Sequence, residues 1–153
     1  MDPAIQEYYD QITTAVERIL AAAEGLDAEG LNWKPIPDET SSLCILNVHI
    51  VGNIRQGILS VLCGQPDNRD RDAEFAATCD SFEELQASWN QLKSDLHAGM
   101  SGLTTDDLQK DYVHPRRGPM NGWTVLLNTA VHANEHVGHA ELTRQLWEVR
   151  GRD

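Results

Sequence analysis

Hydrophobic residues recur at intervals of three and four positions along most of the chain, which is the spacing of one face of an α-helix. The pattern predicts four long helices, over residues 3–24, 42–63, 80–99 and 122–147. The last of them contains no proline, and apolar residues recur through it: Leu126, Leu127, Ala130, Val131, Val137, Ala140, Leu142 and Leu146. Four amphipathic helices of this length predict an all-α fold, a four-helix bundle.

Polar segments separate the predicted helices, over residues 26–41, 64–79 and 100–121. Pro35 and Pro37 forbid a continuous helix in the first of them. The last is long for a connection between two helices, and long connections often border a functional site. No segment shows a convincing strand pattern, so we expect no sheet.

The chain has 153 residues, of which 41% are hydrophobic, so we expect one domain over residues 1–153 with a single core. No apolar run approaches the roughly 20 residues of a membrane span. The N-terminal residues lack the basic and apolar regions of a signal peptide, and we therefore expect a cytoplasmic protein. The formal net charge of −12 argues against nucleic acid and anionic membranes as partners.

The three cysteines are Cys44, Cys63 and Cys79, and no two of them form a C-x-x-C motif. An odd number without such spacing predicts neither a zinc ribbon nor a redox pair. Cys44 lies among apolar residues, so we expect it to be a small core residue.

Three of the six histidines lie in the last predicted helix, at His132, His136 and His139. Steps of four and three residues place all three on one face. Two histidines four residues apart on a helix can bind one metal ion. Alanine and valine flank this face, so it is expected to turn into the core, where unpaired imidazoles are costly. Such pairs also arise by chance, and a pair that is merely hydrogen-bonded remains an alternative.

A fourth histidine, His49, lies in the predicted helix over residues 42–63. If it faces His132 and His136, it completes a three-histidine site, which leaves coordination positions open for water or substrate. Gly52, one turn later, makes room for a close approach or a ligand. Asn53, four residues after His49, is a candidate to hold that imidazole by a hydrogen bond.

Taken together, these features resemble the DinB-like (YfiT-like) superfamily of metal-dependent four-helix-bundle proteins. The resemblance covers LNWKPIPDETSSLCILNVHIVGN, DSFEELQASWNQL and GWTVLLNTAVHANEHVGHAELTRQL, in the order of the family. The family pattern is a tryptophan and a proline in the first loop, one histidine on the second helix and H-x-x-x-H-x-G on the fourth. The matching residues are Trp33, Pro35, His49, His132, His136 and Gly138.

The resemblance implies that His49, His132 and His136 are metal ligands, that the ion is zinc or nickel, and that the protein forms a homodimer. His139 departs from the family pattern, which most often has glutamine at this position. It is a candidate fourth ligand or a residue that supports a ligand or lines the pocket, and a fourth ligand would weaken the case for an enzyme. Asn128, four residues before His132, is a similar supporting candidate.

Characterised relatives in families like this one use a low-molecular-weight thiol in S-transfer or isomerisation. The resemblance therefore implies a metalloenzyme, a thiol-dependent transferase or isomerase that acts on a small molecule. A metal-dependent hydrolase is an alternative, because the same ion could activate water. A non-enzymatic metal-binding or stress-associated protein, and a bundle without metal, are further alternatives. The sequence identifies no distinct nucleophile or general base, and Glu135 is only a weak candidate for proton transfer.

Overall fold

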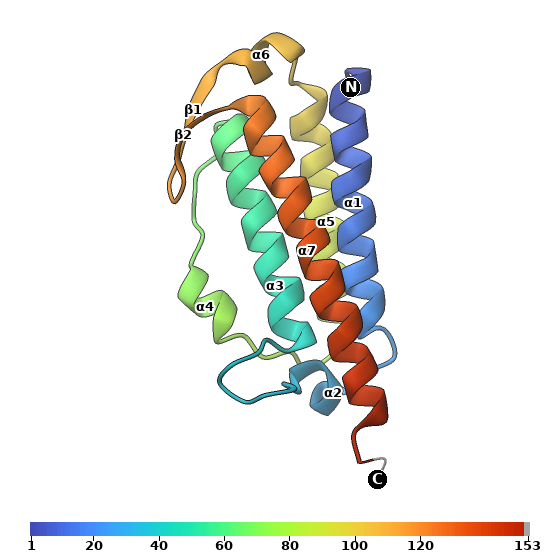
Figure 1. Cartoon of the computed structure of the whole chain (residues 1–153). Coiled ribbons are helices and arrows are strands. Elements are labelled where there is room, and N and C mark those ends of the chain that lie inside the picture. The colour runs from blue at the N-terminus through green and yellow to red at the C-terminus, as the bar shows by residue number, and fades with distance from the viewer. Residues whose placement is uncertain (152–153) are drawn as a thin grey trace.

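The computed structural model describes residues 1–151, in which four long helical rods pack side by side as a bundle (Figure 1). The rods are α1 (Pro3–Ala23), α3 (Leu43–Ile54) with its π-helical continuation η1 (Arg55–Leu62), α5 (Phe82–Ser101) and α7 (Gly122–Val149). This arrangement confirms the predicted all-α four-helix bundle. Residues 152 and 153, which the predicted domain over residues 1–153 includes, lie outside the described residues.

The connections contain short elements that the hydrophobic pattern did not predict. They are the helices α2 (Ala28–Asn32), α4 (Arg71–Phe75) and α6 (Thr105–Gln109) and the strands β1 (Asp111–His114) and β2 (Gly118–Asn121). The two strands pair antiparallel, so the expectation of no sheet was wrong for this hairpin. Four residues a strand are too few for a recognisable alternating pattern, and Gly118 closes the turn at φ +77°.

Side-chain caps fix where α3 and α7 begin. Ser42 Oγ accepts a hydrogen bond from the Ile45 amide at 3.2 Å, and Asn121 Oδ1 accepts one from the Thr124 amide at 2.9 Å. The two capped helices, α3 and α7, are neighbours in the bundle, and they carry the four candidate histidines. The residues at which α3 and α7 begin therefore determine where along the bundle axis these histidines lie relative to one another.

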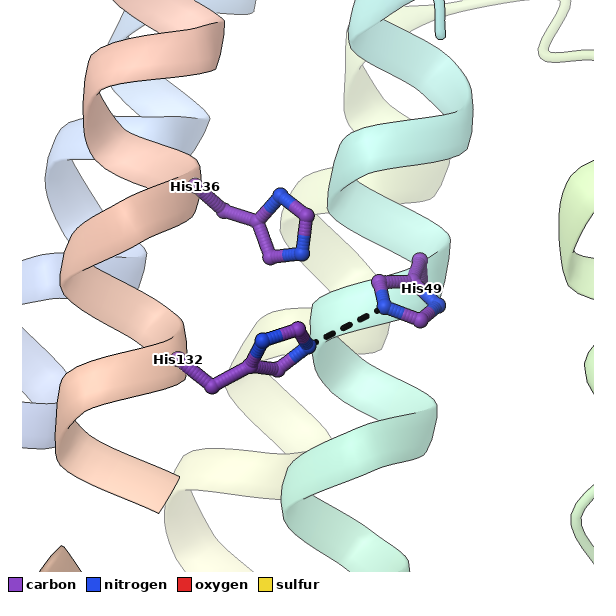
Figure 2. A group of neighbouring side chains, drawn as sticks. All are labelled: His49, His132 and His136. Atoms are coloured by element: carbon purple, nitrogen blue, oxygen red, sulfur yellow. Dashed lines mark hydrogen bonds between the residues drawn. The ribbon is translucent and has the colours of Figure 1, made fainter. Parts of the chain in front are cut away.

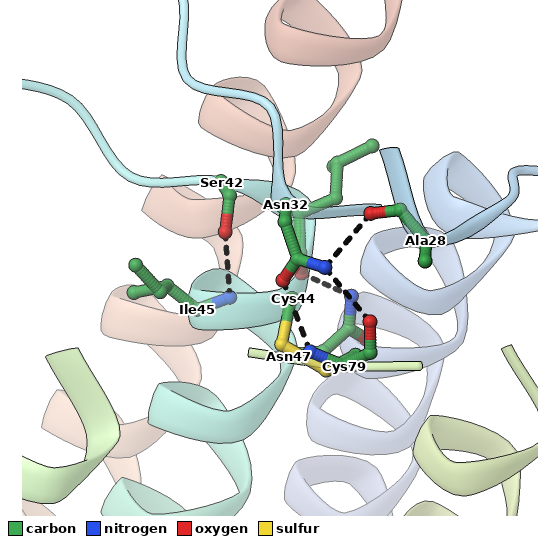
Figure 3. The surroundings of a disulfide bond; sticks show 8 residues. Ala28, Asn32, Ser42, Cys44, Ile45, Asn47 and Cys79 are labelled. Carbon is green, nitrogen blue, oxygen red and sulfur yellow. Dashed lines mark hydrogen bonds between the residues drawn. A yellow bond between two sulfur atoms is a disulfide. The ribbon is translucent and has the colours of Figure 1, made fainter. Parts of the chain in front are cut away.

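A disulfide joins Cys44, in the first turn of α3, to Cys79, in the segment before α5 (Figure 3). Asn32 holds the same segment, because its side-chain amide donates to the Cys79 carbonyl at 2.8 Å and accepts from the Cys79 amide at 3.0 Å. Cys44 is buried in the core, as predicted, but its disulfide to Cys79 was not predicted. The two cysteines are 35 positions apart, and only the fold brings them together.

The segment Leu43–Leu62 is long and apolar enough to cross a membrane by length and composition alone. Within the bundle, however, 61% of its most apolar stretch is buried against the other helices. This is the burial expected of a core helix of a soluble bundle.

Of the eight apolar residues from which the last helix was predicted, half do not face the core. Leu126, Ala130, Val137 and Ala140 are buried, whereas the other four are exposed by a third to a half of their surface: Leu127, Val131, Leu142 and Leu146. Periodicity along a helix cannot distinguish a face packed on the core from a second apolar face that remains uncovered. The second face matters for the site described next.

Candidate metal centre

The structure brings three of the candidate histidines together across the interface between α3 and α7 (Figure 2). His49 comes from α3, and His132 and His136 come from consecutive turns of α7. One ring nitrogen from each lies within 4.8 Å of the others, and the Nε2 atoms of His49 and His132 are 3.2 Å apart. The geometry therefore allows a single ion to be shared by the three imidazoles.

His49 is fixed from behind by a buried ion pair. Glu74 of α4 accepts a hydrogen bond from His49 Nδ1 at 2.9 Å, and Arg69 donates to both carboxylate oxygens of Glu74, at 2.7 and 2.9 Å. The side chains of Arg69, His49 and Glu74 are only 5–7% exposed. Because the carboxylate holds the proton on Nδ1, the lone pair of His49 Nε2 points into the cluster.

Gly52 provides the space for this carboxylate. A Cβ atom at Gly52 would lie 1.9 Å from Glu74 Oε1, far inside any tolerable contact. Gly52 was predicted to make room for a close approach, and the group that approaches it is the Glu74 carboxylate. Arg69 also donates to Gln56 Oε1 at 3.0 Å, and Gln56 in turn donates to Asp67 at 2.8 Å, so the polar network continues away from the cluster.

The two histidines of α7 have weaker partners. His132 Nδ1 lies 3.6 Å from a carboxylate oxygen of Glu135, whose side chain is 64% exposed. His136 Nδ1 lies 3.3 Å from His139 Nδ1. The remaining nitrogen of His136, Nε2, is buried and has no hydrogen-bond partner among the described residues.

Burial keeps these imidazoles neutral. Desolvation is the largest cause that lowers the pKa of His49 and of His132, and at His49 the neighbouring Glu74 opposes the shift. Burial, followed by the charged forms of the neighbouring histidines, lowers the pKa of His136 to about 3. A neutral imidazole is the form that binds metal, so the electrostatics of the cluster favour ligation over protonation.

The residues fit a divalent ion. His49 Nε2 and His132 Nε2 are 3.2 Å apart and share one hydrogen bond, whereas the buried Nε2 of His136 has no hydrogen-bond partner among the described residues. Buried polar atoms without partners are costly, and a cation between the three rings would satisfy them together. Imidazole nitrogen suits zinc, nickel, copper and iron, so the donor atoms alone do not select the metal.

The other candidate residues lie beside the cluster. His139 is exposed and contacts His136 through its ring. Asn53 makes no hydrogen bond to His49 among the described residues, and Glu74 occupies the position expected for it. Asn128 donates to the sulfur of Met120 at 3.8 Å.

Glu74 and Arg69 are the residues that sequence analysis missed. Both lie in the polar connection over residues 64–79, which has no helical or strand periodicity that would point either side chain anywhere. The sequence does contain one indirect signal, since Gly52 on an otherwise apolar helix indicated that something approaches there. Nothing in the pattern identified the approaching group.

The DinB superfamily model matches residues 11–140 of the chain. A DinB-like protein from Bacillus cereus ATCC 10987 superposes with a TM-score of 0.72 at 20% identity, covering 92% of this chain and 89% of that one. A conserved protein from Enterococcus faecalis superposes with a TM-score of 0.74 at 16% identity, covering 95% and 97%. No curated protein sequence matches the chain.

At such identities the two structures support the fold alone, whereas the family model spans most of the chain, including the α3 and α7 segments that carry the clustered histidines. The expectation drawn from the first-loop tryptophan and the spaced histidines is therefore confirmed at the level of the family. This chain belongs to the DinB superfamily.

Proposed function

We propose that this protein binds a divalent metal ion, zinc or nickel, through His49, His132 and His136, and acts as a metalloenzyme on a small molecule. The observation that carries the proposal is the convergence of three neutral imidazoles around the buried, unpartnered Nε2 of His136. Three protein ligands leave coordination positions for an exogenous group, which is typical of catalytic rather than structural sites.

A bound ion of this kind lowers the pKa of a coordinated thiol or water. The protein's own residues would supply orientation and exclusion of solvent. Glu74 and Arg69 hold His49 in one tautomer, so its Nε2 is prepared for ligation. His136 and His139 lie at the edge of a surface groove, by which a small molecule could reach the cluster.

The family resemblance favours a thiol-dependent transferase or isomerase that uses a low-molecular-weight thiol, and we extend the proposal to that class. A hydrolase would use the same ion on water. We further propose a homodimer. The exposed apolar residues Leu127 and Val131 of α7 support an interface between copies.

A non-enzymatic metal-binding or stress-associated protein is the second candidate. It would be favoured if His139, whose Nδ1 lies 3.3 Å from His136 Nδ1, turned toward the ion as a fourth ligand and closed the site. Loss of one ion equivalent on substitution of His139 would support this second function.

Metal content of the purified protein, measured by elemental mass spectrometry before and after reloading with zinc or nickel, tests the proposal. We expect about one ion per chain, lost in His132→Ala and retained in His97→Ala, whose histidine is exposed on α5 away from the cluster. A chain that holds no stoichiometric ion after reloading would overturn the proposal. Transfer of model thiols to electrophiles, assayed on the loaded protein beside hydrolysis of the same electrophiles, then separates the two reaction classes.

A further inference from the structure

We propose that the groove beside His136 is the binding site for the apolar, uncharged body of the substrate, with the substrate's polar head directed to the three histidines. This inference deepens the proposed function and rests on it for the role of the head. The groove has a volume of about 810 Å³, within the range of small-molecule sites in proteins.

The groove lies between the C-terminal half of α7 and the loop over residues 33–41, which leads into α3 at the same end of the bundle (Figure 1). Leu46, one turn before His49, belongs to its wall, and His136 and His139 border it. The groove is therefore continuous with the candidate metal centre, and a bound molecule would extend from the cluster along α7.

The apolar wall on α7 follows the same helix as the histidines. Leu142 comes three residues after His139, and Leu146 and Val149 follow after four and three more. These steps place the three residues on one helix face. Hydrophobic side chains thus occupy the continuation of the α7 face on which His132 and His136 lie.

These side chains are unusually exposed for their type. The exposed fraction is 54% for Leu142, 38% for Leu146, 47% for Val149 and 51% for Ile36 on the opposite loop. Several large exposed hydrophobic residues gathered in one concave site are typical of a ligand groove rather than of ordinary surface. An apolar ligand would cover all four at once.

Hydrogen bonds and aromatic packing hold the loop that forms the second wall. Thr40 Oγ1 accepts from the Ile36 amide at 3.0 Å and donates to the Ile36 carbonyl at 2.9 Å. Trp33, at the start of the loop, packs against Trp147 of α7 with ring centroids 5.7 Å apart. The wall is thus held to α7 by contacts that do not depend on a ligand.

The charge of the groove identifies the class of ligand. The whole chain carries a formal net charge of −12, yet the described acidic and basic residues that line the groove are one of each sign, Glu39 and Arg150. Its remaining lining is apolar or neutral, apart from the two histidines. A groove with no net charge in a strongly acidic protein suits an aliphatic or aromatic body, not an anionic or cationic one.

A homologous series of ligands tests the inference. Straight-chain hydroxamic acids from two to eight carbons have a metal-binding head and an apolar tail of variable length, and calorimetry on the zinc-loaded protein gives each dissociation constant. We expect affinity to rise up to about fourfold for each added methylene until the groove is filled. Affinity that is independent of chain length would overturn the inference.

Matched variants on one helix locate the effect. Leu142→Gln and Leu146→Gln should flatten the dependence on chain length, whereas Leu127→Gln, equally exposed on α7 but outside the groove, should leave it unchanged. All three replace exposed side chains, and the metal content of each is measured first. Equal slopes in the three variants would contradict the assignment.

Two controls separate this inference from the proposed function and from a dimer. Straight-chain alcohols, titrated into metal-free protein, should show the same dependence on chain length in the unaltered chain and lose it in Leu142→Gln, even if no metal site exists. Light scattering reports the oligomeric state of the same samples. A dimer that Leu142→Gln dissociates, without any dependence on alcohol chain length, would show that a second copy covers the groove and would overturn the inference.

Discussion

The two sides of the histidine cluster differ in how they are held. On the α3 side, His49 is enclosed by Glu74 and Arg69, and the three side chains are all but inaccessible to solvent. On the α7 side, the described partners behind His132 and His136 are weaker, an exposed carboxylate 3.6 Å from His132 and the exposed His139 beside His136. One side of the cluster is thus held by a buried ion pair, and the other has no comparable support among the described residues.

This difference follows from what covers each helix. The connection over residues 64–79 returns past α3 and places α4 behind His49, whereas the far half of α7 is bordered by the groove and the loop over residues 33–41 (Figure 1). A rigidly held histidine on one side and an open approach on the other are what the proposed metalloenzyme would require. Four pairs of variants test this contrast, in order of expected effect.

The largest effect is expected from the disulfide, a covalent tie that secures the α3 side. The double variant Cys44→Ser/Cys79→Ser should lower the free energy of unfolding by about 4 kcal/mol, because the disulfide closes a loop whose ends are 35 positions apart. Denaturant titration measures this change, and Cys63→Ser, at a free cysteine, is the control. Equal stability of the double variant and the control would mean that the disulfide does not contribute to the free energy of unfolding.

Removing a histidine from either side should weaken metal binding equally but should change the stability of the metal-free protein by different amounts. His49→Ala and His136→Ala should each weaken zinc binding by more than about 100-fold, beyond the loss expected for an outer partner. His49→Ala should also destabilise the metal-free protein by about 1.5–3 kcal/mol, because it removes a hydrogen bond to a buried carboxylate.

His136→Ala removes a buried nitrogen that has no partner within residues 1–151, so the metal-free protein should be unaffected or slightly stabilised. Chelator competition and thermal unfolding of both variants provide the comparison. Similar destabilisation by the two substitutions would show that the two sides are not held differently.

The carboxylates on the two sides should differ in their effect on affinity. Glu74→Gln should weaken zinc binding by about 10–100-fold, because His49 loses the charged partner that sets its tautomer. Glu135→Gln, whose carboxylate is exposed and 3.6 Å from His132, should change it less than about twofold. Nitrogen chemical shifts of the His49 ring report the tautomer directly. An unchanged tautomer in Glu74→Gln would refute the role of this carboxylate.

Two glycines provide the finest comparison. In Gly52→Ala the added methyl group would displace Glu74 from its hydrogen bond with His49, and zinc affinity should fall about tenfold. A Cβ at Gly138 of α7 meets nothing within 4 Å, so Gly138→Ala should leave affinity unchanged and stabilise the helix by up to about 1 kcal/mol. Zinc titration and thermal unfolding distinguish the two. A loss of zinc affinity in Gly138→Ala but not in Gly52→Ala would contradict this prediction.

The helices and the three histidines could be predicted from sequence because both depend on local spacing. Apolar residues three and four apart define helix faces, and the spacing of His132 and His136 places them on one such face whatever surrounds it. The assignment of His49 needed more, since its position opposite that pair came from the family resemblance. Its role as a ligand stays a prediction.

The residues behind His49 could not be predicted, because nothing local relates them to it. Glu74 is 25 positions from His49 and lies in a short helix within a polar connection, where its neighbours look like ordinary solvated acids. The disulfide between Cys44 and Cys79 and the hairpin at Gly118 were not predicted for the same reason. Each depends on how the chain returns on itself.

The sequence by itself determined the helical bundle, the shared face of the α7 histidines and the family, because repeating patterns and short motifs encode them. Only the tertiary structure decided which apolar face of α7 is buried and which borders a groove, and which carboxylate holds His49. Those outcomes depend on contacts between segments distant in the chain. Packing selects one of several faces that look alike in the sequence.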